Sequence, residues 1–327
     1  MNLHKDKNLF QEILQSTSDL LGLPLILVEK DYWQTYTLFL LIQDPISEDI
    51  ILKGGVALSK CFKLIKRIPD DIDLVISRND GETDSRLKSK LRQISSIITK
   101  ELSEINIEGL TRKRGMNRKT AHSYYYTTIE SYCAEKNLVT IDYSWLGSDR
   151  PRSKLLLNSF IGEALRQTNQ HALIERFSLL PFEVKVLDHY RTFCEKIMSL
   201  VRFSYSEMPI PDLKKKVKHM YDLHQLLRYK EFQDFLRSDR FFEMILSVAN
   251  RDAKSLRNNN QWLRYHPIES LFFSNLEENW LGHFEQVYND DFSMLVYDKL
   301  PMSAQVLKIL LLIKERIRKV EWKTEIL

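Results

Sequence analysis

The chain has 327 residues, with 48 basic and 44 acidic side chains, so its formal net charge is only +4. Its composition, 43% hydrophobic and 28% charged, excludes an intrinsically disordered chain. The nine glycines are about 3% of the residues, against about 7% in an average protein. This scarcity of glycine excludes collagen-like repeats and glycine-rich linkers and favours helix. The spacing of the three cysteines excludes a zinc-finger type of site. The apolar runs are too short for a membrane span, so we expect a cytoplasmic protein.

The first part of the chain mixes helical and strand-like patterns. In chain order these patterns predict helix 8–21, helix 29–42, strand 51–52, helix 56–66, strand 71–77, helix 84–103, strands 105–111, 122–130 and 137–145, strand 183–187 and helix 188–202. Side chains alternate along a strand, so Ile72 and Leu74 are expected on one face of strand 71–77, with Asp71 and Asp73 on the other.

Beyond Pro211 the sequence is predicted to be helical. Apolar residues at helical spacing indicate five further segments: 212–228, 231–236, 240–256, 275–289 and 303–319. We therefore expect an α+β domain in residues 1–205 and an all-helical domain in residues 206–327.

The only adjacent pair of glycines, Gly54-Gly55, lies between strand 51–52 and the helix that follows it. Glycines at such a turn let a phosphate approach the backbone, and the first turn of the helix offers free N–H groups to an anion. On the next strand, Asp71 and Asp73 share a face, so both carboxylates can hold one divalent cation, normally Mg²⁺. Phosphate contacts beside metal ligands are the arrangement that nucleotidyl transfer requires.

A third carboxylate is needed to bind a second metal ion or to activate the attacking hydroxyl. Asp142 is the best candidate, because it lies on the polar face of strand 137–145, whose other face is apolar. Taken singly, the glycine pair is compatible with a tight turn, and each aspartate with a solvated strand. Their combination on consecutive elements favours the functional interpretation.

These residues carry a family resemblance. The segment KGGVALSKCFKLIKRIPDDIDL resembles the KGGTALSK…RFSEDIDL signature of the AbiEii/AbiGii nucleotidyltransferase toxins, which belong to the DNA polymerase β-like superfamily. Three further segments are similar to the family in order and approximate spacing: VEKDYWQTYTL at 28–38, RTFCEKIMSL at 191–200 and KHMYDLHQLL at 218–227. The resemblance covers about residues 25–230.

The resemblance implies a polymerase β-like nucleotidyltransferase core, with a mixed sheet flanked by helices, in residues 1–205 and a helical C-terminal domain in residues 206–327. It implies that Asp71 and Asp73 bind the metal, Mg²⁺ or Mn²⁺, and that Lys196 neutralises triphosphate charge. Asp222 would complete the active site from the helical domain. Contacts to the nucleoside triphosphate are implied for Gly54, Gly55, Ser59, Lys60 and Arg67.

Without the resemblance, Lys196 would be interpreted as a solvated lysine and Asp222 as a helical ion-pair partner of Lys218. The chain also departs from the family pattern at two positions. Val56 stands where the family has Thr or Ser, and Pro69 stands where it has Ser. Neither change affects a metal ligand, so we expect them to influence the choice of nucleotide rather than catalysis.

Two basic clusters are candidates for RNA contact. The first is the predicted turn 112–119, with Arg112, Lys113, Arg114, Arg118 and Lys119, and the second comprises Lys214, Lys215, Lys216 and Lys218. A charge run is often only a solvated surface, but lysines and arginines that contact phosphates are the expected source of affinity for RNA.

The resemblance thus implies a toxin that transfers a nucleoside monophosphate from a triphosphate to an RNA 3′ end, with release of pyrophosphate. The resemblance implies the tRNA acceptor end as the target, an antitoxin encoded nearby and a role in phage defence. The short apolar runs predict no membrane partner. Asp142, or failing it Asp222, would act as the base. The alternatives are transfer to a protein or small-molecule hydroxyl, and a non-catalytic nucleotide-binding module with the same fold.

Overall fold

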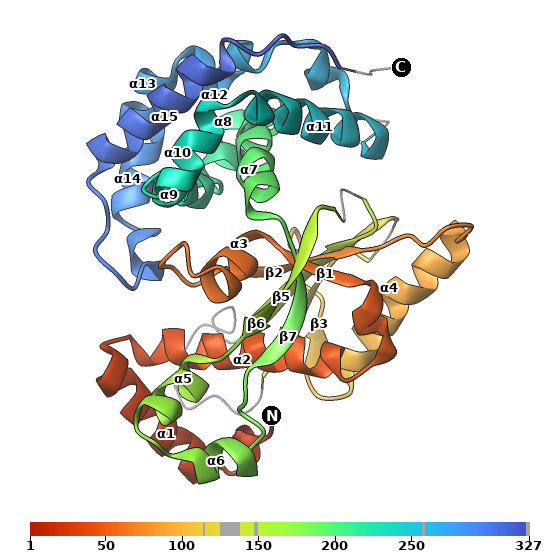
Figure 1. The fold of residues 1–327 in the computed structure, drawn as a ribbon, viewed down its shortest axis with the longest axis vertical. Helices are drawn as coiled ribbons and strands as arrows, with labels where there is room; N and C mark the ends of the chain where they lie inside the picture. The colour runs from red at the N-terminus through yellow and green to blue at the C-terminus, as the bar shows by residue number, and fades with distance from the viewer. Residues whose placement is uncertain (114, 125–137, 147–149, 257–258, 325–327) are drawn as a thin grey trace. The chain divides into compact units, whose positions relative to one another are not determined.

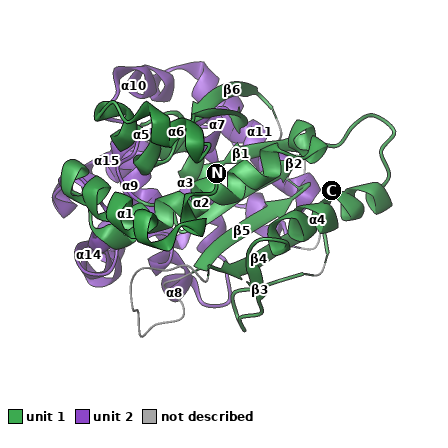
Figure 2. Cartoon of the chain, turned by 90° about the horizontal axis from the view of Figure 1, so that it is seen from below, with its two compact units in different colours: residues 1–63, 68–187 green, residues 64–67, 188–327 purple. Residues whose placement is uncertain are grey.

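The computed structural model describes residues 1–113, 115–124, 138–146, 150–256 and 259–324. The chain divides into two compact units (Figure 2). Unit 1 comprises Met1–Lys63 and Ile68–Leu187, and unit 2 comprises Leu64–Arg67 and Asp188–Leu327. The short segment 64–67 therefore belongs to the unit formed by the C-terminal part of the chain.

Unit 1 is built on one seven-stranded sheet with the order β3-β4-β5-β2-β1-β7-β6 (Figure 1). The strands are β1 Ile50–Lys53, β2 Asp71–Ile76, β3 Ser103–Ile105, β4 Asn117–Ser123, β5 Leu138–Ser144, β6 Arg152–Leu157 and β7 Phe182–Leu187. The sheet is mixed, because β1 runs parallel to β7 and β2 parallel to β5, whereas the remaining neighbours are antiparallel. The predicted α+β class and mixed sheet are confirmed.

The helices of unit 1 are α1 Lys7–Leu21, α2 Leu25–Ile42, α3 Gly54–Val56, α4 Asp84–Thr99, α5 Phe160–Gln167 and α6 His171–Arg176. Helix α2 lies across one face of the sheet (Figure 1). Leu38 of α2 lines a cavity of about 220 Å³ together with Leu52 of β1 and Leu74 of β2. Leu74 therefore points toward α2, and the alternation along β2 places Asp71 and Asp73 on the opposite face.

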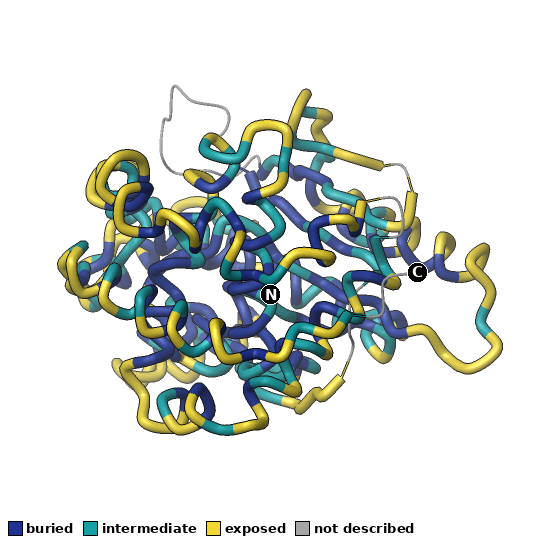
Figure 3. Tube along the Cα trace, turned by 90° about the horizontal axis from the view of Figure 1, so that it is seen from above, coloured by how far each residue is buried: buried dark blue, intermediate teal, exposed yellow. Residues whose placement is uncertain are grey.

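Burial follows this division of β2 into two faces. Ile72 and Leu74 are almost fully buried, whereas Asp71 and Asp73 are half-buried. Buried residues fill the interior, and exposed residues gather on the peripheral helices and loops (Figure 3). The predicted alternation of strand 71–77 is confirmed, and it leaves two carboxylates accessible on a strand that is otherwise part of the core.

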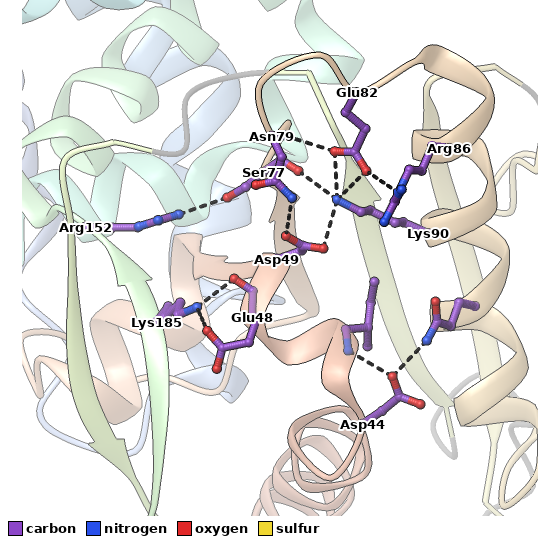
Figure 4. Close-up of polar contacts among 12 residues, drawn as sticks. Asp44, Glu48, Asp49, Ser77, Asn79, Glu82, Arg86, Lys90, Arg152 and Lys185 are labelled. Carbon is purple, nitrogen blue, oxygen red and sulfur yellow. Dashed lines mark hydrogen bonds and ion pairs between the residues drawn. The ribbon is translucent and has the colours of Figure 1, made fainter.

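Ion pairs stabilise the end of the sheet at which β1 begins and β2 ends (Figure 4). Lys90 of α4 is buried there, and its ammonium lies 2.8 Å from Asp49 Oδ2 and 2.7 Å from Glu82 Oε1. Lys185 of β7 pairs with Glu48 at 2.6 Å. Asp71 and Asp73 lie toward the other end of β2, where that strand begins.

The structure corrects the predicted helix 56–66. Helix α3 continues into one π-helical turn, Ala57–Cys61, and the helical segment ends there. Lys63 then adopts a positive φ of 57°, a backbone conformation that stops a right-handed helix. Because helical spacing of apolar residues continues past this point, the sequence pattern gave no sign of the break.

Two of the predicted strands are also displaced. The segment 105–111 is largely a turn that follows β3, because Gly109 adopts a φ of +75°. Strand β4 begins at Asn117, inside the predicted basic turn, and only its last residues overlap the predicted strand 122–130; residues 125–137 lie outside the described part of the chain. Strand β6 and helices α5 and α6 had no counterpart in the prediction.

Unit 2 is helical in its described residues, as predicted. Its helices are α7 His189–Phe203, α8 Pro209–Lys214, α9 Val217–Leu226, α10 Lys230–Arg237, α11 Asp239–Ser255, α12 Leu271–Ser274, α13 Leu276–Asn279, α14 Glu285–Asn289 and α15 Ser303–Ile317. Helix α7 packs against α9 and α11, so the division between the units lies at Leu187 and Asp188 rather than near residue 205. Among the helices in the described ranges, none has the length and apolar character of a membrane span.

Candidate active site

Three carboxylates lie on adjacent strands of unit 1. Asp71 and Asp73 are separated by one residue on β2 and therefore share a face. Asp142 lies on the neighbouring parallel strand β5, directly in register with Asp73. Because neighbouring strands are about 4.8 Å apart, this register brings the third predicted carboxylate beside the first two.

Gly54 lies against one of these carboxylates. A Cβ atom at this position would be 3.0 Å from Asp73 Cγ and still closer to Asp73 Oδ2. The backbone of Gly54 also has a φ of +69°, which side chains other than glycine rarely adopt. Glycine is therefore favoured at residue 54 for two reasons: its positive φ, and the Asp73 carboxylate, which would have to move to admit a Cβ atom. Gly55 follows as a buried residue of α3.

Two lysines flank the carboxylates. The Lys119 ammonium lies 2.8 Å from Asp71 Oδ2, and the Lys119 backbone is in register with Asp142 across the β4–β5 pair. Lys53 is in register with Asp73 across the β1–β2 pair. The sequence predicted Lys119 as a residue of a basic turn, whereas the structure places it on a strand, at the carboxylates. Lys53 was missed, although it directly precedes the glycine pair.

The surroundings change the protonation of Asp142. Burial raises the pKa of its carboxyl group, because the charged form loses hydration, and the negative charge of Asp71 adds to this shift. Lys119 and Lys53 act in the opposite direction but do not cancel the increase. A carboxylate with a raised pKa is a stronger base than an exposed one, and this suits proton acceptance.

Asp71 and Asp73 are the residues that could hold a metal ion. Their donor set consists of carboxylate oxygens, which suits Mg²⁺, a cation that usually takes one or two protein carboxylates and fills its remaining positions with water and phosphate oxygens. Within the described ranges, no group of three or more His, Cys, Asp or Glu side chains is arranged to hold a metal. A site of two carboxylates, with its remaining positions filled by substrate oxygens, fits this donor set and the absence of a larger ligand group among the described residues.

The predicted phosphate contacts are distributed over different environments. Lys60 is buried and its ammonium pairs with Asp31 of α2, which also accepts a hydrogen bond from the Phe160 backbone N–H at 2.8 Å. Ser59 is buried in the π-helical turn. Of the five residues predicted to contact the triphosphate, Gly54 therefore lies at the carboxylates, whereas the charge of Lys60 is paired with Asp31.

A second charged cluster lies entirely within unit 2. Arg67 donates to both carboxylate oxygens of Asp222, at 2.8 and 2.7 Å, and the Lys196 ammonium lies 2.8 Å from Asp222 Oδ2. Asp222 is fully buried, and Arg67 is only 2% exposed. Burial would raise the pKa of Asp222, but the two cations outweigh it and hold the pKa below its usual value. The structure therefore brings three predicted residues together as a buried ion cluster.

The predicted RNA contacts lie at several places. Arg112 and Lys113 are exposed, and Lys113 pairs with Glu104 at 2.8 Å; Arg114 lies outside the described residues. Arg118 is on β4 next to Lys119, so their side chains point to opposite faces of the sheet.

The second basic cluster spans the junction of α8 and α9 in unit 2. Lys214 is exposed, and Lys215 pairs with Asp212 at 3.0 Å. The Lys216 ammonium lies 4.4 Å from the centre of the Phe203 ring, and Lys218 is half-buried. Lys214 and Lys215 are thus the most accessible members of this cluster.

Comparisons with known proteins identify the family of this chain. The family model described as nucleotidyl transferase AbiEii toxin, type IV toxin–antitoxin system, matches residues 37–310. A search of curated proteins gave no match. Among solved structures the chain is similar to MenT4, a nucleotidyltransferase toxin from Mycobacterium tuberculosis H37Rv, with a TM-score of 0.54 and 13% identity, covering 91% of this chain and 85% of that chain. That likeness shows a shared fold, and the family match spans most of the sequence. The chain therefore belongs to the AbiEii nucleotidyltransferase toxin family of type IV toxin–antitoxin systems.

Proposed function

We propose that this protein transfers a nucleoside monophosphate from a nucleoside triphosphate to the 3′-hydroxyl of an RNA, with the tRNA acceptor end as the target. The observation that carries the proposal is the strand register that places Asp142 beside Asp73, with Asp71 on the same face, and the position of the Asp73 carboxylate against Gly54. Family membership supports a toxin of this activity with a cognate antitoxin. The basic side chains of β4 and of the α8–α9 junction support a polyanionic acceptor.

Asp71 and Asp73 would hold Mg²⁺ through their carboxylate oxygens. When bound, the ion supplies positive charge that stabilises the phosphate oxygens of the transition state. The half-buried position of both side chains leaves them reachable by the triphosphate, and Gly54 keeps the backbone close without a Cβ atom in the way. Lys119, which pairs with Asp71, adds positive charge at the same place.

Asp142 is the base in this proposal. Its carboxylate takes the proton of the RNA 3′-hydroxyl while the 3′-oxygen forms a bond to the α-phosphorus, the bond between the α- and β-phosphates breaks, and pyrophosphate leaves. Asp222 is the weaker candidate, because Arg67 and Lys196 occupy both its oxygens and its pKa is lowered. We assign Asp222 the role of a positioning residue for those two cations.

Labelling of the acceptor tests this function. The purified protein is incubated with each α-labelled nucleoside triphosphate, Mg²⁺ and either total RNA or total protein, and tRNA 3′ ends are then sequenced. We expect label in RNA and added nucleotides at tRNA 3′ ends, and no label when Mg²⁺ is chelated. Label only in protein would show that the acceptor is a protein hydroxyl. Binding of nucleotide without any transfer would show a non-catalytic module.

A second test uses the glycine at the site. Gly54→Ala is expected to lower kcat by about 10²-fold, because the new Cβ displaces the Asp73 carboxylate, and a shift of about 1 Å in a reacting group has this order of effect. Gly81→Ala is a matched control: Gly81 also has a positive φ, +73°, but its Cβ would contact nothing within 4 Å. Each variant should lose about 1–2 kcal/mol of stability. Equal activity of the two variants would contradict the assigned role of Gly54.

A further inference from the structure

An open pocket of about 460 Å³ lies between helix α4 and strand β4 in unit 1. Four of the residues that line it are cationic: Arg92, Lys100, Lys113 and Arg118. The others are the hydroxyl residues Ser95, Ser96 and Thr99. No carboxylate and no aromatic ring lines the pocket within the described part of the chain. Its chemistry is therefore that of an anion site.

The periodicity of α4 produces this surface. Leu91, Ile94 and Ile98 are buried against unit 1, so the opposite face of the helix is turned to solvent. Arg92 and Lys100 lie on that exposed side, eight residues apart, which corresponds to about 12 Å along a helix. The cations are thus spread over a length greater than that of a single phosphate group.

Three of these cations have no ion-pair partner among the residues that the structure describes. Arg92, Lys100 and Arg118 make no ion pair with any described residue, whereas Lys113 is held by Glu104 at 2.8 Å. The Nε atom of Arg118 is buried and has no hydrogen-bond partner among the described residues. A buried donor without a partner is costly in a folded protein, so a ligand or ordered water is expected to complete it.

We propose that this α4–β4 pocket binds the phosphate backbone of the RNA acceptor; the proposal rests on the function proposed above. Cations and hydroxyls without an aromatic platform contact phosphate and ribose rather than stacked bases. The position on β4 connects the pocket to the reaction: Lys119 reaches Asp71, and the adjacent Arg118 lines the pocket on the other face of the same sheet. Strand β4, which carries both Arg118 and Lys119, would then fix the position of the bound RNA relative to the carboxylates.

The test is charge reversal on the exposed face of α4. The double variant R92E/K100E leaves the residues of the proposed active site unchanged. Binding of a fluorescent tRNA acceptor hairpin is measured by anisotropy at several salt concentrations. We expect the dissociation constant to rise at least about 10-fold and the slope of log affinity against log salt to fall by about two, one for each lost phosphate contact. R166E/K230E, which reverses two exposed cations on α5 and α10, is the control with the same change in net charge.

The outcomes separate this inference from the proposed function. Unchanged RNA affinity and salt slope in R92E/K100E, with normal transfer to RNA, would overturn the pocket assignment alone. Loss of nucleoside triphosphate affinity with RNA affinity unchanged would also overturn it, because the pocket would then be a nucleotide site. Absence of any transfer to RNA by the unmodified protein would instead refute the proposed function. R92Q/K100Q, which removes charge without reversing it, should give a smaller change of the same sign.

Discussion

Replacement of Asp73 with asparagine is expected to lower nucleotidyl transfer by at least about 10³-fold and to abolish toxicity. The substitution keeps the size of the side chain but removes one of the two negative charges, those of Asp71 and Asp73, that would hold Mg²⁺. Loss of a single group that stabilises developing charge already costs about 10²–10³-fold in rate, and a metal ligand contributes more. Transfer is measured with labelled triphosphate and RNA, and toxicity by growth after induction.

The fold should survive this substitution. Asp73 is half-buried on β2, and Ile72 and Leu74 on either side supply the apolar contacts of the strand. The melting temperature of Asp73→Asn should therefore remain close to that of the unmodified protein. Asp80→Asn, at an exposed position shortly after β2, is the matched control and should keep full activity. Full toxicity of a well-expressed Asp73→Ala variant would refute the metal assignment.

The largest loss of stability is expected for Asp222→Ala. The substitution leaves Arg67 and Lys196 buried without their shared carboxylate, and breaking a buried ion pair from one side costs about 3–5 kcal/mol. Asp234→Ala, at an exposed position on α10, is the control and should change stability little. The free energy of unfolding in urea measures both. An Asp222→Ala variant as stable as the control would mean that the buried cluster does not hold unit 2 together.

The same cluster gives a pH dependence. The pKa of Asp222 is lowered below its ordinary value of 3.8 in the folded state, so its contribution to stability is present above that value. The contribution is lost as pH falls through the folded-state pKa, because the carboxyl must then be protonated. Asp222→Asn lacks this titration, so its stability should fall less steeply on acidification than that of the unmodified protein.

The local part of the site was predictable from the sequence. Strand periodicity correctly predicted that Asp71 and Asp73 share a face, because alternation along a strand depends only on neighbouring residues. It also placed Asp142 on the polar face of β5. The register that brings Asp142 beside Asp73 depends on the pairing of two strands far apart in sequence, and the alternation pattern does not specify such a pairing.

The interpretation of charged residues was less successful, because their partners are distant in the chain. Lys60 pairs with Asp31, Arg67 with Asp222, and Lys119 with Asp71. A run of basic residues suggested a turn at 112–119, yet β4 begins inside it and sends adjacent residues to opposite faces. Strand alternation that includes Arg118 and Lys119 could have indicated that β4 begins before residue 122. The high charge of the segment favoured the interpretation as a turn instead.

The assignment of residues 64–67 to unit 2 affects how the protein can be divided. Arg67 reaches Asp222 from a segment that precedes β2, while the rest of unit 2 begins at Asp188. A fragment consisting of residues 188–327 would contain the buried aspartate and Lys196 but not the guanidinium that binds both carboxylate oxygens. The helical unit is therefore not contiguous in the chain, and a fragment of residues 188–327 would leave Asp222 without the cation that binds both its oxygens.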